Sequence, residues 1–156
     1  INMFRIIKSN INNKGLVATK DITKNTRIIE YKGRLISKKE TETNKKFDNE
    51  KFIYLFNINK KYDLDGDYEY NTARLINHSC EPNCEVTGKG TKLWISSIKN
   101  IKKGVELTYD YGFSYDENYK DYVCKCRSLK CCGYIVRKGS RWRINKSKPW
   151  LKRSFK

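Results

Sequence analysis

Short apolar runs separated by polar turns fill the first third of the chain. The runs Phe4–Ile7, Leu16–Ala18 and Arg27–Tyr31 are rich in apolar and β-branched residues, a composition typical of short strands. Gly33 follows the third run and marks a bend. The pattern therefore predicts three short strands connected by tight polar turns.

The next stretch changes from polar to aromatic. The segment from Ser37 to Glu50 is polar and charged, and Glu40 stands three residues after Ser37. This is capping-box spacing, so a short helix is predicted to begin at Ser37. Lys51–Asn57 is rich in aromatic residues and is predicted to form a buried strand.

The rest of the chain continues with short elements. Glu85–Val86 and Lys92–Ser97 flank the Gly-rich stretch Thr87–Gly90, which predicts a β-hairpin. Gly104 breaks the chain before the apolar run Val105–Tyr109. We find no internal repeat and no long helical period, so the sequence predicts a mostly-β domain of many short strands with one or two minor helices.

Composition limits the class of protein. With 156 residues and a mass of 18.5 kDa, the chain suits one domain with one core. No apolar run approaches the roughly 20 residues of a membrane span, and no signal-peptide pattern is visible at the start. We therefore expect no membrane association.

The positive charge is uneven. Residues 122–156 hold 12 Lys and Arg and no Asp or Glu, which leaves +5 of the net +17 for the first 121 residues. Such a basic tail suits a polyanion such as DNA, or it is a solvated tail that aids solubility. Trp142, Trp150 and Phe155 lie among the basic residues and favour a nucleic-acid or partner contact.

The six cysteines suggest a metal. Cys124, Cys126 and Cys131 follow the pattern C-x-C-x4-C, and close thiolates favour zinc in tetrahedral geometry. Cys80 is the best candidate for a fourth ligand. Cys84 and Cys132 are then spare, with Cys132 a possible substitute ligand, and the alternative is that all are small buried hydrophobes. Disulfides are not expected without an export signal.

The segment from Arg74 to Asn83, RLINHSCEPN, is the strongest local signal. Asn77 and His78 carry amide and imidazole groups that can hold a polar cofactor. A lone histidine is more often structural than catalytic. Ser79 and Cys80 adjoin His78 in the sequence, but adjacency along the chain does not make a nucleophile–base pair.

Seven segments resemble, in order, those of the SET domain with its post-SET zinc module. They are Lys14-Gly15-Leu16-Val17-Ala18, Glu30-Tyr31-Lys32-Gly33, Tyr54-Leu55-Phe56, Leu64-Asp65-Gly66, the RLINHSCEPN segment, the ELTYDYG segment from Glu106 to Gly112, and the CKCRSLKC segment from Cys124 to Cys131. The resemblance covers roughly residues 4–136.

This resemblance implies a SET-domain fold, in which the C-terminal segment threads beneath the loop with the N-H-S-C motif like a pseudoknot. It implies a SET domain at 4–115, a post-SET zinc module at 120–136 and a basic tail at 137–156. S-adenosylmethionine and structural zinc are the implied cofactors. The implied donor-binding residues are Lys14, Gly15, Leu16, Asn77, His78 and Ile135, and the implied zinc ligands are Cys80, Cys124, Cys126 and Cys131.

The resemblance also assigns the channel residues. Tyr111 resembles the family's catalytic tyrosine, Tyr54 is expected to line the same channel, and Tyr109 matches a position that limits the product, so mono- or dimethylation is expected. The donor loop departs from the family's G-x-G because it begins with Asn13. Asparagine tolerates a left-handed backbone better than most residues, although affinity for the donor is expected to fall.

The implied function is protein lysine methylation, with a histone or histone-like substrate. The alternatives are a catalytically silent SET-like module that binds chromatin or nucleic acid, and a zinc-ribbon nucleic-acid binder. We expect a monomer, DNA contact through the basic tail, and a nuclear or chromosomal location, with the cytoplasm as the alternative. The acidic alternation Asp63, Asp65, Asp67, Glu69 is expected to attract a cationic peptide.

Overall fold

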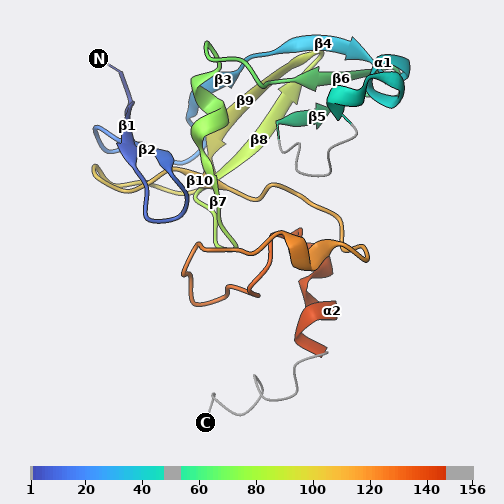
Figure 1. Cartoon of the computed structure of the whole chain (residues 1–156). Helices are drawn as coiled ribbons and strands as arrows, with labels where there is room; N and C mark the ends of the chain where they lie inside the picture. The colour runs from blue at the N-terminus through green and yellow to red at the C-terminus, as the bar shows by residue number, and fades with distance from the viewer. Residues whose placement is uncertain (1, 48–53, 147–156) are drawn as a thin grey trace.

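The computed structural model describes residues 2–47 and 54–146, which form short strands and short helices (Figure 1). The strands are β1 (Phe4–Lys8), β2 (Lys14–Ala18), β3 (Arg27–Tyr31), β4 (Arg34–Ser37), β5 (Leu55–Asn57), β6 (Tyr62–Asp65), β7 (Asn77–His78), β8 (Cys84–Lys89), β9 (Lys92–Ser97) and β10 (Thr108–Tyr109). The helices are α1 (Lys38–Thr43), α2 (Arg141–Lys146) and the 3-10 turns η1 (Lys45–Phe47), η2 (Thr72–Leu75), η3 (Tyr119–Asp121) and η4 (Lys138–Ser140).

Within the described residues, the strands form four small sheets. Two sheets have three strands each, in the orders β3-β9-β8 and β4-β6-β5, and β1 pairs with β2. The fourth is the parallel pair of β10 and β7. The prediction of a mostly-β protein with minor helices is confirmed, and the C-terminal segment lies beneath these sheets (Figure 1).

The predicted N-terminal strands are confirmed, with small shifts at their ends. The strand predicted at Arg27–Tyr31 matches β3, while β1 extends by one residue to Lys8. Of the strand predicted at Lys51–Asn57, residues 55–57 form β5, and residues 51–53 lie outside the described part.

The predicted hairpin forms, but its turn lies later than predicted. β8 and β9 pair from Cys84 opposite Ser97 to Lys89 opposite Lys92, so the turn is at Gly90 and Thr91. Gly90 has a φ of 64°, which glycine adopts without steric cost. The placement of the turn at residues 87–90 was wrong because the residues after Val86 continue the ladder.

The chain after Gly104 runs between two earlier segments. Val105 accepts a hydrogen bond from Ala18 N (3.0 Å), and Leu107 donates to Leu16 O (2.8 Å). β10 then pairs with β7, and the Tyr109 carbonyl accepts from Ser79 N (3.1 Å). The segment carrying Tyr109 is therefore held between β2 and the N-H-S-C loop, which is the arrangement that the SET-domain threading requires.

The helix predicted at Ser37 forms as α1. The Ser37 hydroxyl accepts from Glu40 N (3.1 Å), as a helix N-cap should. The helix and the turn after it place two lysines over β6, where Lys38 pairs with Asp63 and Lys46 pairs with Asp65 (2.6 Å).

These ion pairs correct one expectation about the acidic alternation. Asp63 and Asp65 are 4% and 0% exposed, and each already has a lysine partner. A carboxylate in the interior needs a cationic partner, because the partner offsets the cost of removing the charge from water. Asp63 and Asp65 therefore brace α1 against β6 and do not face a cationic peptide.

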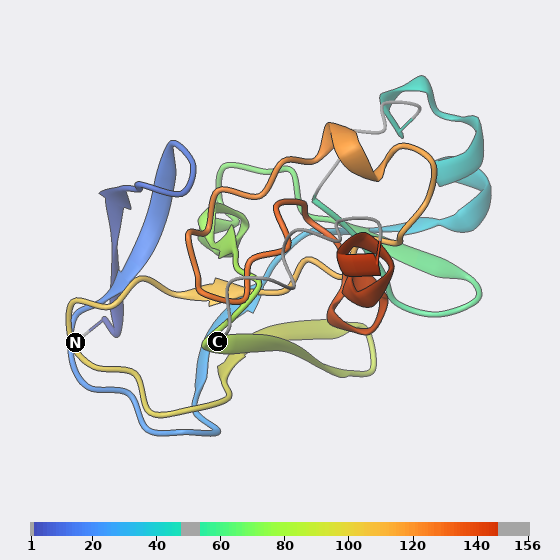
Figure 2. The ribbon, with the colours of Figure 1, turned by 90° about the horizontal axis from the view of Figure 1, so that it is seen from below.

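Two apolar clusters stabilise the molecule. The larger lies between the sheets and includes Leu16, Tyr31, Ile95 and Leu107, each 0% or 1% exposed. The smaller lies beneath and consists of Cys80, Tyr119, Cys132, Val136 and Ile144. Seen from below, the orange-to-red C-terminal segment crosses the face turned to the viewer and ends in α2 (Figure 2).

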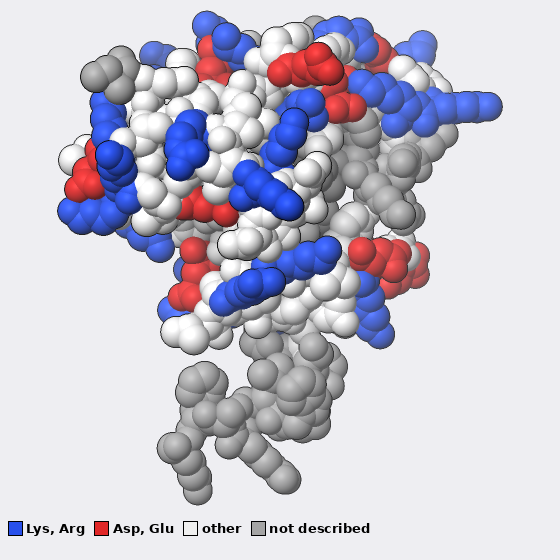
Figure 3. Space-filling view, turned by 60° about the vertical axis from the view of Figure 1, so that its left-hand side comes forward, with Lys and Arg blue, Asp and Glu red and all other residues white. Residues whose placement is uncertain are grey.

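The face shown in Figure 3 has charges of both signs. On the face shown in Figure 3, blue Lys and Arg side chains lie both above and below, with red acidic side chains among them. Within the described residues, no helix is long and apolar enough to cross a bilayer.

Candidate functional site

The Asn77 side chain holds the β1–β2 loop in place. Its Nδ2 donates to Lys14 O (2.9 Å) and lies within hydrogen-bonding distance of the Glu106 carboxylate (2.9 Å) and of Ser9 Oγ (3.1 Å). Asn77 is 5% exposed. Three segments thus converge on one buried amide, which connects the loop to the parallel strand pair.

Glu106 completes this junction and was missed as a site residue by the sequence analysis. Its Oε1 also accepts from Ser9 Oγ (2.8 Å). A Cβ atom built on Gly15 would overlap this carboxylate and come within 3.1 Å of Ser9 Cβ. Gly15 is therefore needed for the close approach of Glu106. Asn13 has a φ of 40°, so the loop keeps a left-handed turn at this non-glycine position.

His78 joins the tyrosine strand to the cysteine cluster. Its Nδ1 accepts from Tyr111 N (3.1 Å), and its Nε2 lies 3.7 Å from Cys80 Sγ. Burial lowers the pKa of His78 to about 4; the Asp110 carboxylate opposes this shift and Arg141 adds to it. A neutral ring that accepts at Nδ1 carries its proton on Nε2, so it can donate to the sulfur.

The predicted channel tyrosines lie together. The ring centroids of Tyr109 and Tyr111 are 4.9 Å apart, and Phe56 lies 6.2 Å from Tyr109. The Tyr111 hydroxyl donates to Ile76 O (3.0 Å), which leaves its lone pairs free for another donor. Burial and, to a smaller extent, Tyr54 raise the pKa of Tyr111. The phenol is therefore neutral near pH 7 and is not a general base.

Two clefts meet at the Tyr111 ring. The first, of about 170 Å³, is lined by Ile11, His78, Val123 and Ile135, and the second, of about 190 Å³, by Lys14, Tyr54 and Arg74. Both also include Asn12, Asn77 and Tyr111, so we treat them as one curved space, called here the inner cleft. The end with Ile11, Val123 and Ile135 is called here the apolar end, although Lys125 also lines it, and the end with Lys14 and Arg74 is called the cationic end.

A separate depression, called here the outer groove, reaches Tyr111 from another side. It has a volume of about 610 Å³, and its lining includes Phe56, Pro82, Val86 and Ile98 together with Tyr111. Tyr111 therefore lines both the inner cleft and the outer groove.

Among the predicted donor-binding residues, the side-chain positions differ. Lys14, Asn77, His78 and Ile135 line the inner cleft. Leu16 is fully buried and its carbonyl is used by Leu107, and Gly15 packs on Glu106. Gly15 and Leu16 therefore support the wall of the cleft from behind.

Arg74 is a second residue that the sequence analysis did not assign. Its Nε is buried and makes no hydrogen bond within the described part of the chain. Its guanidinium lies over the Tyr54 ring, 5.7 Å from the centroid, at the cationic end of the inner cleft. Its Nη1 lies 3.9 Å from the Asp67 carboxylate, and the side chain is 25% exposed. Arg74 therefore has one acidic neighbour and adds positive charge to this end of the inner cleft.

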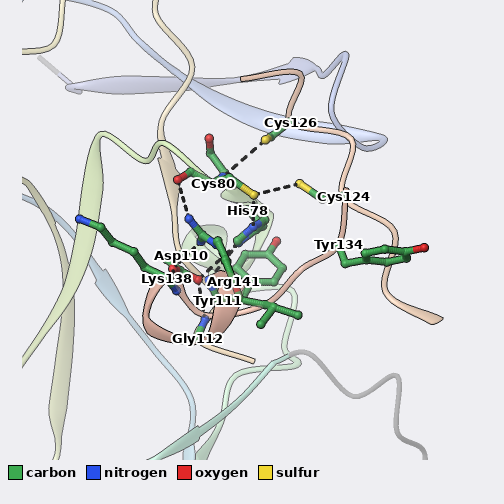
Figure 4. Close-up of polar contacts among 12 residues, drawn as sticks. His78, Cys80, Asp110, Tyr111, Gly112, Cys124, Cys126, Tyr134, Lys138 and Arg141 are labelled. Atoms are coloured by element: carbon green, nitrogen blue, oxygen red, sulfur yellow. Dashed lines mark hydrogen bonds and ion pairs between the residues drawn. The ribbon is translucent and has the colours of Figure 1, made fainter. Parts of the chain in front are cut away.

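Four cysteine sulfurs converge beside His78. The Sγ atoms of Cys80, Cys124, Cys126 and Cys131 lie within 4.8 Å of one another. Cys80 Sγ is 3.8 Å from Cys124 Sγ (Figure 4), and it is 4.0 Å from Cys131 Sγ. Tetrahedral zinc with Zn–S bonds of about 2.3 Å needs sulfurs about 3.8 Å apart, so the cluster fits zinc.

Backbone amides also suit this cluster to thiolates. Cys80 N donates to Cys126 Sγ and Gly133 N to Cys131 Sγ, both at 3.4 Å. Cys132 Sγ contacts Tyr134 O (3.2 Å), and Cys84 Sγ contacts Asn83 Oδ1 (3.4 Å). Neither Cys84 nor Cys132 belongs to the set of four converging sulfurs.

Small sheets, a threaded C-terminal segment and a tyrosine between two depressions define the class of protein. The chain belongs to the SET domain family, whose model matches residues 13–112. It is 39% identical over 132 residues (81% of this chain, 2% of the relative) to Histone-lysine N-methyltransferase 2D of Homo sapiens.

Two further relatives have similar names. The chain is 34% identical over 137 residues (83% of this chain, 4% of the relative) to Histone-lysine N-methyltransferase trithorax of Drosophila melanogaster. It is 37% identical over 140 residues (85% of this chain, 9% of the relative) to Histone-lysine N-methyltransferase set-2 of Caenorhabditis elegans. The chain thus spans less than a tenth of the length of these three relatives.

Proposed function

We propose that the chain is a protein lysine methyltransferase that takes its methyl group from S-adenosylmethionine. The observation that carries this proposal is the position of Tyr111, which lines both the inner cleft and the outer groove. A transfer between two large reactants needs such a meeting point, because the reacting atoms must approach in line to about 3–3.5 Å. The relatives named as histone-lysine methyltransferases support the same activity.

The inner cleft suits the parts of the methyl donor. Its apolar end, with Ile11, Val123 and Ile135, would hold the adenine, beside His78. Its cationic end, with Lys14 and Arg74, would hold the carboxylate. The bound donor supplies a methyl group carried on a positively charged sulfur.

The residues around Tyr111 would prepare the lysine. The attacking amine must be neutral, and a free lysine has a pKa of about 10.4. Desolvation among Phe56, Tyr109 and Tyr111 favours the neutral amine. The Tyr111 hydroxyl donates its own hydrogen bond to Ile76 O. Its lone pairs would accept a hydrogen bond from the amine and orient it. The proton of the amine leaves to water.

Tyr109 would limit the product to mono- or dimethyl-lysine. Its side chain is buried beside Tyr111, and burial raises the pKa of Tyr109, so the hydroxyl stays protonated. A hydroxyl in this position would occupy space and hold a water that a second or third methyl group must displace.

A histone or histone-like protein is the proposed substrate. The outer groove is larger than either part of the inner cleft, as a polypeptide requires. Zinc bound by the four cysteines would be structural, because four sulfur ligands leave no open position. The chain would then work on chromatin, in the nucleus or on a chromosome, as a monomer.

Methyl transfer with a Tyr111→Phe control tests this function. The intact chain is incubated with labelled donor, a panel of histones and a cell lysate, and the modified lysines are mapped. The phenylalanine variant should lose about 10²–10³-fold in kcat, the scale of removing one positioned polar group, while keeping its melting temperature. Equal labelling by both proteins would refute the role of Tyr111, and transfer by neither would favour a silent SET-like binding module.

Contact with DNA is proposed for the extreme C-terminus. Removal of residues 147–156 takes away Lys148, Lys152, Arg153 and Lys156 and leaves α2 complete. Phosphate contacts contribute affinity that falls with salt. Binding to a nucleosome should weaken relative to free histone peptide, with a smaller salt dependence. Unchanged affinity for nucleosomes would show that these residues do not contact DNA.

A further inference from the structure

Arg141, the first residue of α2, is buried although it belongs to the basic C-terminal segment. Its side chain is 10% exposed. Nε donates to Val136 O, Nη1 to Cys80 O and Nη2 to the Asp110 carboxylate, each at 2.7 Å (Figure 4). A guanidinium with three directed acceptors is a structural component of the interior, and a solvated arm would not show this pattern.

Asp110 carries this contact to the tyrosine strand, because it stands between Tyr109 and Tyr111. Its Oδ1 accepts from Gly112 N (3.0 Å), and its Oδ2 accepts from Lys138 N (3.0 Å) as well as from Arg141. One carboxylate therefore fixes the backbone turn that directly follows Tyr111. The charge of Arg141 offsets that of Asp110, and the pair is largely withdrawn from water.

A second anchor fixes α2 to the cysteine cluster. Ile144 is 0% exposed and packs with Cys80, Tyr119, Cys132 and Val136. Together with the bond from Arg141 to the Cys80 carbonyl, this contact joins the helix to a zinc ligand. The apolar and polar anchors lie on neighbouring turns of α2, so the helix has a defined position on the outer groove.

We propose that Arg141 is a positioning residue for methyl transfer, holding the turn after Tyr111 through Asp110 against the loop that carries Cys80. Through Arg141, α2 then helps to position the residues of the outer groove, the proposed substrate side of the site. The kinetic part of this inference rests on the proposed methyltransferase function. A lysine cannot replace the arginine, because one ammonium group cannot reach three acceptors that a planar guanidinium meets at once.

The inferred effect is larger on one side of the site. Asp110, Tyr111, Gly112, Lys138 and Arg141 all line the outer groove. The inner cleft has a brace of its own, since Asn77 is held by Lys14 and Glu106, but it shares Tyr111 and is reached from Asp110 through His78. Loss of the Arg141 contacts should therefore reduce the rate of transfer more than it reduces affinity for the donor.

Arg141→Lys is compared with Arg143→Lys, an exposed arginine on the same helix. The measurements on the intact zinc-loaded chain are kcat with a histone substrate, the Kd for S-adenosylhomocysteine, zinc content, melting temperature and amide exchange at residues 108–113. We expect Arg141→Lys to lower kcat by about 10–100-fold, the scale of a small misplacement at a reacting centre. Zinc content should stay unchanged, Kd should change much less than kcat, and exchange at residues 110–113 should become faster.

Asp110→Asn and the double variant show whether Arg141 acts through the carboxylate. If it does, the double variant should be little worse than the worse single variant. Equal kcat in Arg141→Lys and the parent, or a loss that only follows the unfolded fraction, overturns the proposal. Where the parent transfers no methyl group, the proposed function fails, and unchanged exchange at residues 110–113 in Arg141→Lys then overturns the positioning role by itself.

Discussion

The inner cleft and the C-terminal region below it are built by different means. The wall of the cleft consists of strands: β2 pairs with β1 and with the segment after Gly104, and Asn77 adds a side-chain bond. Residues 113–140 include two short 3-10 turns and no paired strand longer than the single bridge from Val123 to Tyr134. This C-terminal region depends on converging sulfurs and on the anchors of α2. Removal of a zinc ion bound by the four cysteines should therefore loosen the C-terminal region and leave the wall of the cleft folded.

The largest expected effect comes from substituting one of the four cysteines proposed to bind zinc. Cys126→Ser should abolish zinc binding, because apparent binding energies of structural zinc are about 10–16 kcal/mol and a hydroxyl is a poor replacement for a thiolate. Methyl transfer should be lost, since His78 Nε2 lies 3.7 Å from Cys80 Sγ and Ile135, which lines the inner cleft, belongs to the C-terminal region. Zinc content, activity and residue-level amide exchange measure the change.

Cys132→Ser is the matched control, because Cys132 lies outside the four converging sulfurs and a serine can still donate to Tyr134 O. This variant should retain zinc. Exchange in Cys126→Ser should rise across residues 113–140 and stay slow in β3 and β9, which pair in the β3-β9-β8 sheet. If amide exchange became faster to the same extent in residues 113–140 and in β3 and β9, the two regions would not be independently stabilised.

The next effect tests the inner cleft alone. Gly15→Ala would force its new Cβ against Glu106 and Ser9, and overpacking of this kind typically costs about 1–3 kcal/mol. Because Glu106 also holds Asn77, the affinity for S-adenosylhomocysteine should fall about tenfold, which is about 1.4 kcal/mol. Calorimetric titration measures this affinity.

Gly139→Ala is the control for that variant, because a Cβ there meets nothing within 4 Å and the backbone has no positive φ. It should leave affinity for the donor and zinc content unchanged. A normal affinity in Gly15→Ala would mean that the loop adapts and that Glu106 does not set the shape of the cleft.

The contrast between local and distant contacts also explains which features could be predicted from the sequence. Strand periodicity and the serine cap depend on neighbouring residues, so β3 and the start of α1 were predicted correctly. The family motifs identified two groups of residues. Tyr109 and Tyr111 lie beside each other in the structure, and the four cysteines converge at another point. Glu106, Arg74 and Arg141 have roles defined by partners 29 to 97 residues away or by burial, and no local pattern reports such a partner.

Burial also reverses what a charge pattern suggests. Asp63 and Asp65 alternate with apolar residues as a solvated acidic edge would, yet lysines from α1 and η1 cover them. Arg141 counted as part of a basic tail, although it lies in the interior. Charge along the sequence is a guide to partners only where the side chain stays in water.

A smaller effect concerns the product and not the rate of the first transfer. Tyr109→Phe removes a buried hydroxyl beside Tyr111 and keeps the ring. The proposed channel should then admit a more highly methylated amine, so the fraction of di- and trimethyl-lysine should rise several-fold while monomethylation changes little. Mass spectrometry of product peptides measures the distribution. Trimethyl-lysine as the main product of the parent chain would contradict the limiting role of Tyr109.

The smallest effect appears only in alkaline solution. Burial raises the pKa values of Tyr31 and Tyr109 above their usual value near 10. The folded state therefore keeps both protons while the unfolded chain loses them, so stability is constant below about pH 9 and falls as the pH rises beyond 10. At pH 10, where half of the unfolded phenols are ionised, each buried tyrosine should cost about 0.4 kcal/mol. Chemical denaturation at several pH values, with Tyr109→Phe as the matched variant, measures the slope. The phenylalanine variant should lose stability less steeply above pH 10, because one buried phenol no longer titrates, and an identical slope would mean that Tyr109 ionises in the folded protein as freely as in the unfolded chain.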